Sequence, residues 1–191
     1  MSRTLEFNRS ATLNKAIVLF WRKGYQAASL PELLEAMEIG RSSFYATYGD
    51  KRSLFFECLQ IFGKRTKDFL LKAKCDHQPL DALRLFFENT VSEQRGQRTE
   101  WGCMMVNTVL ELDDVDDELS AHASSLLADM QIEFESCLRV AGLAPKLAHQ
   151  YASFLMQFNE GIRVSSRRRV SREQQLSDID TAFRLIGSVA H

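Results

Sequence analysis

The sequence predicts an all-α protein of about nine helices. Apolar residues recur along nearly the whole chain at the three- to four-residue spacing of one helical face. The 191 residues include only 9 Gly and 3 Pro, too few for the frequent turns of a β sandwich or barrel. At 45% hydrophobic and 26% charged, the composition is that of a globular protein whose core needs no disulfide or metal.

Three short helices are expected first. Apolar residues at helical spacing mark the first of them: Leu13, Ile17 and Phe20. Gly24 stands where a left-handed stop is wanted. Ser29 then opens a second helix through a capping box with Glu32, and after a break at residues 38–41 a third covers residues 42–48.

Six further helices are expected beyond Gly49. Asp50 can cap a long helix, and Pro79 and Pro145 can each start one. The expected ranges are about 50–74, 79–94, 101–112, a helix from the acidic cluster 113–118 to 140, then 145–167 and 173–188, with a loop at 95–99. We predict two domains: residues 1–52, with the three short helices, and residues 53–191.

Residues 29–51, SLPELLEAMEIGRSSFYATYGDK, describe a helix-turn-helix. In its second helix only Phe44 and Tyr48, four residues apart, are expected in a core. The remaining side chains are small or form hydrogen bonds, so this helix can enter the major groove of DNA. The residues expected to face DNA are Arg41, Ser42, Ser43, Tyr45 and Thr47, with Lys51 on a phosphate. A solvated three-helix corner without a ligand stays open as an alternative.

Charge is divided unevenly along the chain. Residues 1–75 carry 13 Lys and Arg against 7 Asp and Glu, whereas residues 76–191 carry 11 against 18. A basic first part beside an acidic remainder favours contact of the N-terminal end with a polyanion.

The string FWRKGY, SLPELLEAM, SFYATY and GDKRSL, in this order and spacing, resembles the TetR family of bacterial transcriptional regulators. The resemblance implies a homodimer with an N-terminal DNA-binding headpiece and a larger helical domain that holds a small-molecule pocket and a dimer interface. It places Tyr45 and Lys51 on phosphates and Ser29 on the DNA backbone, and Tyr48, though a core residue, is counted with the DNA-binding set. Three positions depart from the family pattern: Glu38 replaces the turn glycine, Gly40 the Ser or Thr cap, and Ala46 a frequent His or aromatic residue.

Aromatic and methionine side chains on the middle helices suit a flat or apolar ligand. They suit an ordinary core equally well. The expected pocket residues are Phe86, Trp101, Met104, Met105, Asn107, Met130, Phe134, Phe154 and Phe158.

Two apolar stripes on the last helices resemble the pair that forms a dimer interface in this family. The stripes are Tyr151, Phe154, Leu155, Phe158 and Ile162 on one helix and Ile179, Phe183 and Ile186 on the other. Packing of both stripes inside the monomer is the alternative, and both can hold because each helix can bury two sides.

The four cysteines lie far apart and form no metal-binding pattern, so reduced thiols and no cofactor or metal are expected. Cys103 follows Gly102 at an expected helix start, where a thiolate is favoured, and is either a sensor thiol or a packing residue. Cys58 and Cys137 fall on apolar faces, and Cys75 is expected at the surface.

These observations favour a cytoplasmic repressor that binds a palindromic operator as a homodimer and is released by a small molecule or an electrophile. An enzyme is not expected, because no nucleophile elbow, glycine-rich phosphate loop, metal cluster or partnered carboxylate pair is present. A helical adaptor without DNA binding is the second hypothesis, against which Arg41, Tyr45 and Lys51 argue. Neither a signal peptide nor a membrane span is visible.

Overall fold

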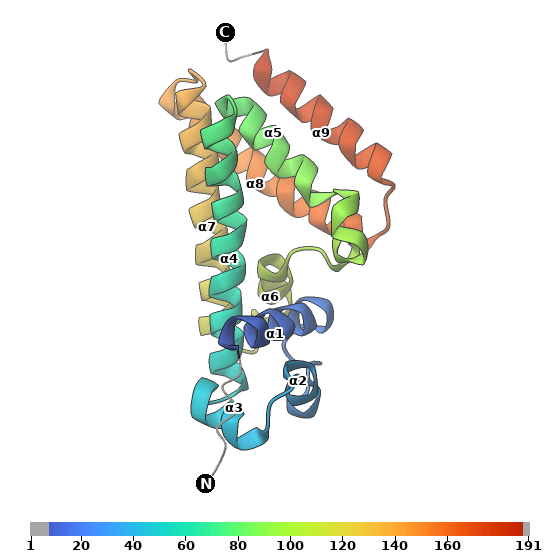
Figure 1. Cartoon of the computed structure of the whole chain (residues 1–191). Helices are drawn as coiled ribbons and strands as arrows, with labels where there is room; N and C mark the ends of the chain where they lie inside the picture. Colours follow the sequence, from blue (N-terminus) through green and yellow to red (C-terminus); the bar gives the residue numbers. More distant parts are fainter. Residues whose placement is uncertain (1–7, 189–191) are drawn as a thin grey trace.

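The computed structural model describes residues 8–188, apart from the side chains of residues 93–95 and 97. All regular structure in that part of the chain is helical, which confirms the predicted fold class (Figure 1). The elements are α1 (Arg9–Lys23), α2 (Leu30–Met37), α3 (Arg41–Tyr48), α4 (Lys51–Asp76), α5 (Pro79–Thr90), the 3-10 helix η1 (Glu93–Trp101), α6 (Met104–Leu112), α7 (Asp117–Val140), α8 (Pro145–Arg167) and α9 (Arg172–Gly187).

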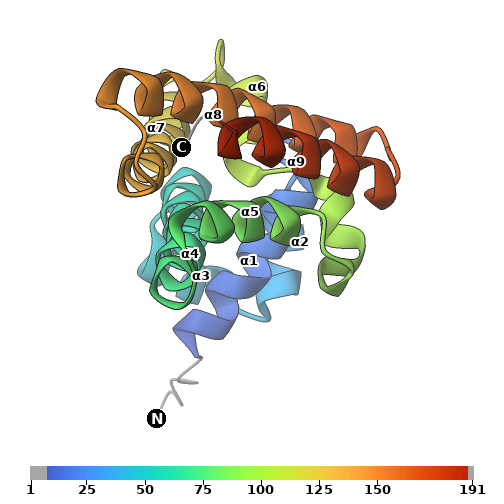
Figure 2. The same cartoon turned by 90° about the horizontal axis from the view of Figure 1, so that it is seen from above.

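The long helices α4 and α7 run side by side along the molecule. Figure 1 shows α1, α2 and α3 around one end of this pair and α5, α8 and α9 at the other, with α6 between. In Figure 2, α5, α8 and α9 extend away from α4 and α7 on the side where α1 lies. No helix in the described part of the chain is both long and apolar enough to cross a membrane.

Buried side chains form two apolar clusters, one at each end of the α4–α7 pair. The first joins the headpiece helices α1–α3 to the start of α4 and to α6, and it includes Phe20, Phe44 and Met104. The second joins the end of α4 to α5, α7, α8 and α9, and it includes Phe87 and Phe134. The headpiece core is therefore continuous with α6, although α6 lies far away in sequence.

The structure differs from the expected elements around residues 91–103. The fifth helix ends at Thr90, and the expected loop at 95–99 lies within η1, which is interrupted at Gly96. The next helix begins at Met104, because Gly102 has φ +72° and Cys103 is extended. Trp101 therefore precedes α6 and belongs to η1.

Glu111 at the end of α6 holds the turn that follows α1. Its carboxylate accepts hydrogen bonds from the backbone N–H groups of Tyr25, at 2.9 Å, and Gln26, at 2.7 Å. Gly24 makes this approach possible, since it has φ +86° and a Cβ there would lie 2.5 Å from a Glu111 carboxylate oxygen. A side chain from the body of the protein thus closes the headpiece turn.

Two further contacts tie the headpiece to the body. The Trp21 indole N–H donates to the Gly102 carbonyl at 3.2 Å. At the start of α4, the Arg52 guanidinium donates to Asp116 at 2.6 and 2.9 Å and to Glu118 at 2.6 Å. These contacts join α1 and α4 to the segments that flank α6.

We predict that Glu111→Ala lowers the free energy of unfolding by about 1–3 kcal/mol, because two backbone donors lose a charged acceptor. Glu111→Gln retains one acceptor oxygen and should lose less. Chemical denaturation followed by circular dichroism measures both. Asp129→Ala, at an exposed position of α7, is the control. Equal stability of Glu111→Ala and the control would show that the turn is held by packing alone.

Candidate nucleic-acid interface and effector cavity

The turn between α2 and α3 has the features that the sequence predicts. Ser29 and Glu32 form the capping box at the start of α2. Hydrogen bonds from Lys23 and from Ser29 lower the pKa of the Glu32 carboxyl to about 2, so the box stays ionised near neutral pH. Glu38 takes the left-handed conformation with φ +57°, and Gly40 caps α3 without a side-chain bond.

Helix α3 is anchored by two side chains and exposes most of the others. Phe44 is fully buried and Tyr48 is 5% exposed, as the i, i+4 spacing predicts. The residues on the outer surface are Arg41, Ser42, Ser43, Tyr45 and Ala46, with Thr47 half-buried. Figure 1 places this helix at one end of the molecule. A polar helix face is thus presented at that end.

Arg41 is available to a ligand. Its guanidinium forms no hydrogen bond or ion pair within the described residues, although Arg9, Lys15, Lys23 and Arg52 of the same headpiece are each paired with a carboxylate. An exposed cation without an acidic partner on a polar helix face is suited to an anionic surface.

The structure corrects one expected DNA contact and qualifies two others. The Tyr48 hydroxyl is enclosed and burial raises its pKa, so Tyr48 belongs to the headpiece core and does not face DNA. The Lys51 ammonium lies 4.7 Å from the Tyr25 ring centre and 3.4 Å from the Gln26 carbonyl oxygen, where a phosphate would have to compete for it. The exposed Ser29 hydroxyl donates to Glu32 at 2.8 Å.

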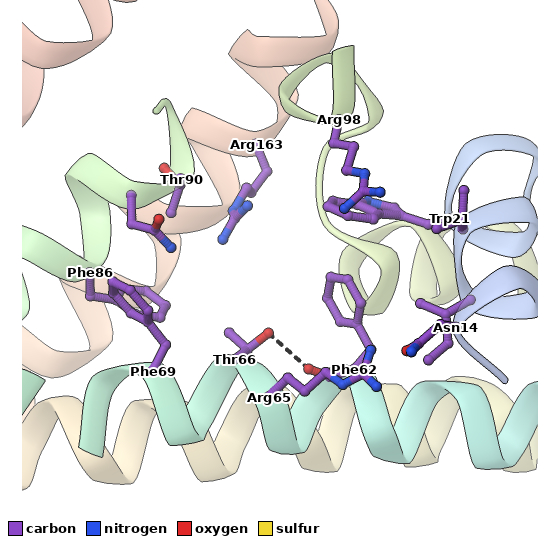
Figure 3. A pocket seen from close by; sticks show the side chains of 13 residues that line it. Asn14, Trp21, Phe62, Arg65, Thr66, Phe69, Phe86, Thr90, Arg98 and Arg163 are labelled. Carbon is purple, nitrogen blue, oxygen red and sulfur yellow. Dashed lines mark hydrogen bonds between the residues drawn. The ribbon is translucent and has the colours of Figure 1, made fainter. Parts of the chain in front are cut away.

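A cavity of about 490 Å³ lies between the headpiece and the body (Figure 3). Its walls come from α1, α4, α5, α8 and η1. The lining residues are Asn14, Ile17, Val18, Trp21, Phe62, Arg65, Thr66, Phe69, Phe86, Asn89, Thr90, Arg98 and Arg163. Ile17, Trp21 and Phe62 belong to the first apolar cluster and Phe86 to the second, so the cavity occupies the junction of the two.

Most residues expected in the pocket lie elsewhere. Phe86 lines the cavity. Four others are buried core residues, in agreement with the alternative that these side chains form an ordinary core: Met104, Met105, Met130 and Phe134. Phe154 is 46% exposed on the outer surface of α8. The other three are outside this cavity: Trp101 packs edge-to-face on Trp21, Phe158 stacks on Phe87, and Asn107 accepts from Arg167 at 3.0 Å.

Phe86 is the one lining residue that was predicted for the pocket, and Arg163 is the buried charged residue among those that were not. It lies on the inner side of α8, in a row with Asn159 and Ser166, which are also buried. The available signal was a charged residue on a helical row whose other members are small, apolar or uncharged. That row indicates a polar site inside the protein rather than a solvated face.

The degree of burial of Cys58, Cys137 and Cys75 agrees with the sequence prediction. Cys58 and Cys137 are fully buried, and burial raises the pKa of both thiols. Cys75 is exposed. Cys103 caps α6 but is only 2% exposed and does not line the cavity, so a reagent would have to open the structure to reach its sulfur.

Most of the expected dimer stripe packs inside the monomer. Leu155, Ile162, Ile179, Phe183 and Ile186 are all buried in the second apolar cluster, because α8 packs on α7 and α9 packs on α5. Tyr151 and Phe158 are partly buried against that cluster. One side of each helix therefore completes the monomer, and the buried members of the stripe are not available to a second chain.

Phe154 of the expected stripe remains on the outside of these helices, together with Val164 and Leu185, which were not predicted there. Phe154 is 46% exposed and Val164 44% on α8, and Leu185 is 62% exposed on α9. Phe154 stacks on Phe158 with ring centres 6.1 Å apart. This outer face is the part of α8 and α9 that could meet another chain.

Two family models match the chain. Residues 13–58 match bacterial regulatory proteins of the tetR family, and residues 79–180 match the C-terminal domain of LmrA/YxaF-like transcriptional regulators. The second match alone covers more than half of the chain. The chain belongs to the TetR family of transcriptional regulators.

Curated relatives agree with this TetR-family membership. The HTH-type transcriptional repressor ComR of Escherichia coli strain K12 is 30% identical over 190 residues, which cover 94% of this chain and 89% of ComR. The uncharacterized HTH-type transcriptional regulator YezE of Bacillus subtilis strain 168 is 31% identical over 124 residues, but the match spans only 63% of YezE and 64% of this chain.

Solved structures of TetR-family regulators share the fold. A cysteine mutant of the regulator CifR, complexed with 26-base-pair double-stranded operator DNA, is 26% identical with a TM-score of 0.84 and covers 95% of this chain and 98% of its own. SCO4454 from Streptomyces coelicolor is 14% identical with the same TM-score, covering 96% of each chain.

The buried and exposed tyrosines of this TetR-family headpiece give a paired prediction. Tyr45→Phe should weaken binding to operator DNA by roughly 3-fold to 10-fold, because an exposed hydroxyl that can donate to a phosphate is lost. Tyr48→Phe should leave the affinity unchanged, since its hydroxyl is enclosed. Fluorescence anisotropy with labelled operator DNA measures both. A larger loss for Tyr48→Phe than for Tyr45→Phe would contradict the assignment of Tyr48 to the core.

Proposed function

We propose that this chain is a cytoplasmic repressor that binds a palindromic operator as a homodimer through α3 and releases it when a small molecule occupies the cavity. The observation that carries the proposal is the outer face of α3. This face exposes Arg41, Ser42, Ser43 and Tyr45, while Phe44 is buried in the core and anchors the helix. Arg41 has no acidic partner among the described residues.

Helix α3 suits the major groove in shape and chemistry. The groove is about 12 Å wide and admits one α-helix, so small side chains such as Ser42 and Ser43 let the backbone approach the bases. Arg41 at the first turn can donate to a guanine edge or to a phosphate. CifR, which shares this fold, is solved in complex with operator DNA, and this supports operator binding by the present chain. Repression is supported by ComR, which is a repressor.

Dimerisation is supported by the outer surfaces of α8 and α9. Exposed Phe154, Val164 and Leu185 are apolar side chains that a second copy can cover. A two-fold interface uses the same surface on both copies and presents two α3 helices to two half-sites. The dimer surface that we propose therefore lies on the opposite side of these helices from the buried stripe.

The cavity supports control by a small molecule because both parts of the protein line it. Asn14, Ile17 and Trp21 of the headpiece helix α1 face it, and so does Phe62 of α4, the helix that follows α3. A ligand that fits the cavity better in one position of α1 shifts the population towards that position. The spacing of the two α3 helices in the dimer then changes, and operator affinity falls.

A thiol-reactive inducer acting at Cys103 is the alternative form of control. The burial of Cys103 favours the non-covalent form, since an electrophile has to reach a sulfur atom that the folded chain covers. Operator binding measured before and after a mild oxidant, with Cys103→Ser beside it, separates the two. A loss of binding that reductant reverses, and that the variant does not show, would favour the thiol.

The operator proposal predicts that Arg41→Ala lowers operator affinity by at least roughly 10-fold, because each half-site loses a base or phosphate contact. The test is a gel shift with the DNA upstream of the protein's own gene. Lys72→Ala, an exposed cation on α4, is the control and should bind as the original protein does. An unchanged affinity of Arg41→Ala would favour a helical adaptor that does not use this face on DNA.

The dimer proposal predicts that Phe154→Glu gives a monomer, because a charge would be buried in the apolar interface. Sedimentation equilibrium gives the mass, and circular dichroism should show an intact fold, since Phe154 is already half-exposed in one chain. Val140→Glu, at an exposed apolar position at the end of α7, should remain dimeric. A dimer that survives Phe154→Glu would place the interface elsewhere.

A further inference from the structure

The lining of the cavity carries a marked excess of positive charge. Arg65, Arg98 and Arg163 all border it, and no Asp or Glu is among its lining residues. None of the three arginines forms a hydrogen bond or an ion pair within the described part of the chain. Figure 3 shows Arg163 reaching into the space from α8 and Arg98 from η1.

Arg163 is the unusual member of this set. Arg65 and Arg98 are exposed and can be hydrated at the edge of the cavity, but Arg163 is only 6% exposed. Its Nε is enclosed and has no hydrogen-bond partner. Burial lowers the pKa of the guanidinium. A buried arginine without a carboxylate is costly for the fold and calls for an anion from outside.

The rest of the lining is suited to the body of an organic molecule. Trp21, Phe62, Phe69 and Phe86 supply aromatic walls on two sides of the space (Figure 3). Asn89 and Thr90 add hydrogen-bonding groups from α5. A volume of about 490 Å³ lies in the range of small-molecule sites, which combine apolar walls with a few placed polar groups.

We propose that the effector is an organic acid with an apolar, ring-sized body, whose carboxylate pairs with Arg163. Arg98 at the edge of the cavity is placed to attract the same charge. The guanidinium presents a planar set of donors that matches a carboxylate, and the aromatic side chains enclose the body of the ligand. This inference rests on the proposed function, because it assigns a ligand class to the proposed effector cavity.

The test compares an acid with its uncharged amide. The probes are 2-naphthoate and 2-naphthamide, which have nearly the same shape and differ in charge. Binding is followed by tryptophan fluorescence, because Trp21 lines the cavity. The ring centre of Trp101 lies 5.5 Å from that of Trp21. We expect the acid to bind roughly 10-fold to 100-fold more tightly than the amide, the range for a charge-assisted hydrogen bond.

Variants then assign the preference to one residue. Arg163→Met keeps an unbranched apolar stem without the guanidinium and should remove the preference, whereas Arg163→Lys should keep part of it. Arg139→Met, at an exposed arginine on α7 outside the cavity, should bind both probes as the original protein does. In the absence of probe, Arg163→Met should unfold at a higher temperature, because an unpaired buried charge has been removed.

Two results would overturn the inference. One is a failure of the unmodified protein to prefer the acid, including no binding of either probe up to about 1 mM. The other is a preference that persists in Arg163→Met. The first comparison needs no variant, so a folding defect cannot mask it. Operator binding of the same samples without probe reports separately on the proposed function, whose failure would appear as absent binding in every sample.

Discussion

One carboxylate, that of Glu111, joins the turn of the headpiece to the body of the protein. It accepts two backbone N–H groups of the turn between α1 and α2, and Gly24 leaves the space that it needs. Because the acceptor comes from α6, the body of the protein contributes to the geometry of the headpiece beside the capping box and core of the headpiece itself. Two further hydrogen bonds join the headpiece to the segments that flank α6. Trp21 donates to the Gly102 carbonyl, and Arg52 donates to Asp116. The orientation of α3 is therefore a property of the whole chain, and a change near α6 can alter it.

The two apolar clusters explain why the cavity lies where it does. Each cluster contains large buried side chains, such as Phe55 in the first and Phe134 in the second, and the cavity between them is lined by apolar residues of both clusters together with polar and charged ones. Closely packed cores move as units rather than deforming continuously. The ligand that we propose at their junction would act on the angle between two rigid parts, and α1 and α4, which both line the cavity, are the elements that would transmit that angle to α3.

Local features of the fold were predictable because they depend on neighbours in sequence. The capping box of Ser29 and the burial of Phe44 follow from spacing and residue type alone, whereas the left-handed turn at Glu38 was expected only from the resemblance to the TetR family. The apolar stripes of α8 and α9 were visible as well, but a stripe does not say whether its partner is the same chain or another one. Ile179 packs inward because α9 meets α5, a contact across nearly a hundred residues. The Glu111 acceptor and the cavity depend on equally distant contacts, which no periodicity encodes.

The free-energy cost of leaving Arg163 unpaired is comparable to the free energy that a ligand needs to switch the protein between two conformations. Leaving one partner of a buried ion pair unpaired typically costs about 3–5 kcal/mol. A two-state equilibrium moves from 1:99 to 99:1 when a ligand prefers one state by about 5.5 kcal/mol. An anion that reaches Arg163 in one arrangement of α1 and α8, and not in the other, would supply a large share of that difference through a single contact. The charge that lowers the stability of the empty protein is then the charge that makes its conformation responsive, because the same uncompensated group provides both effects.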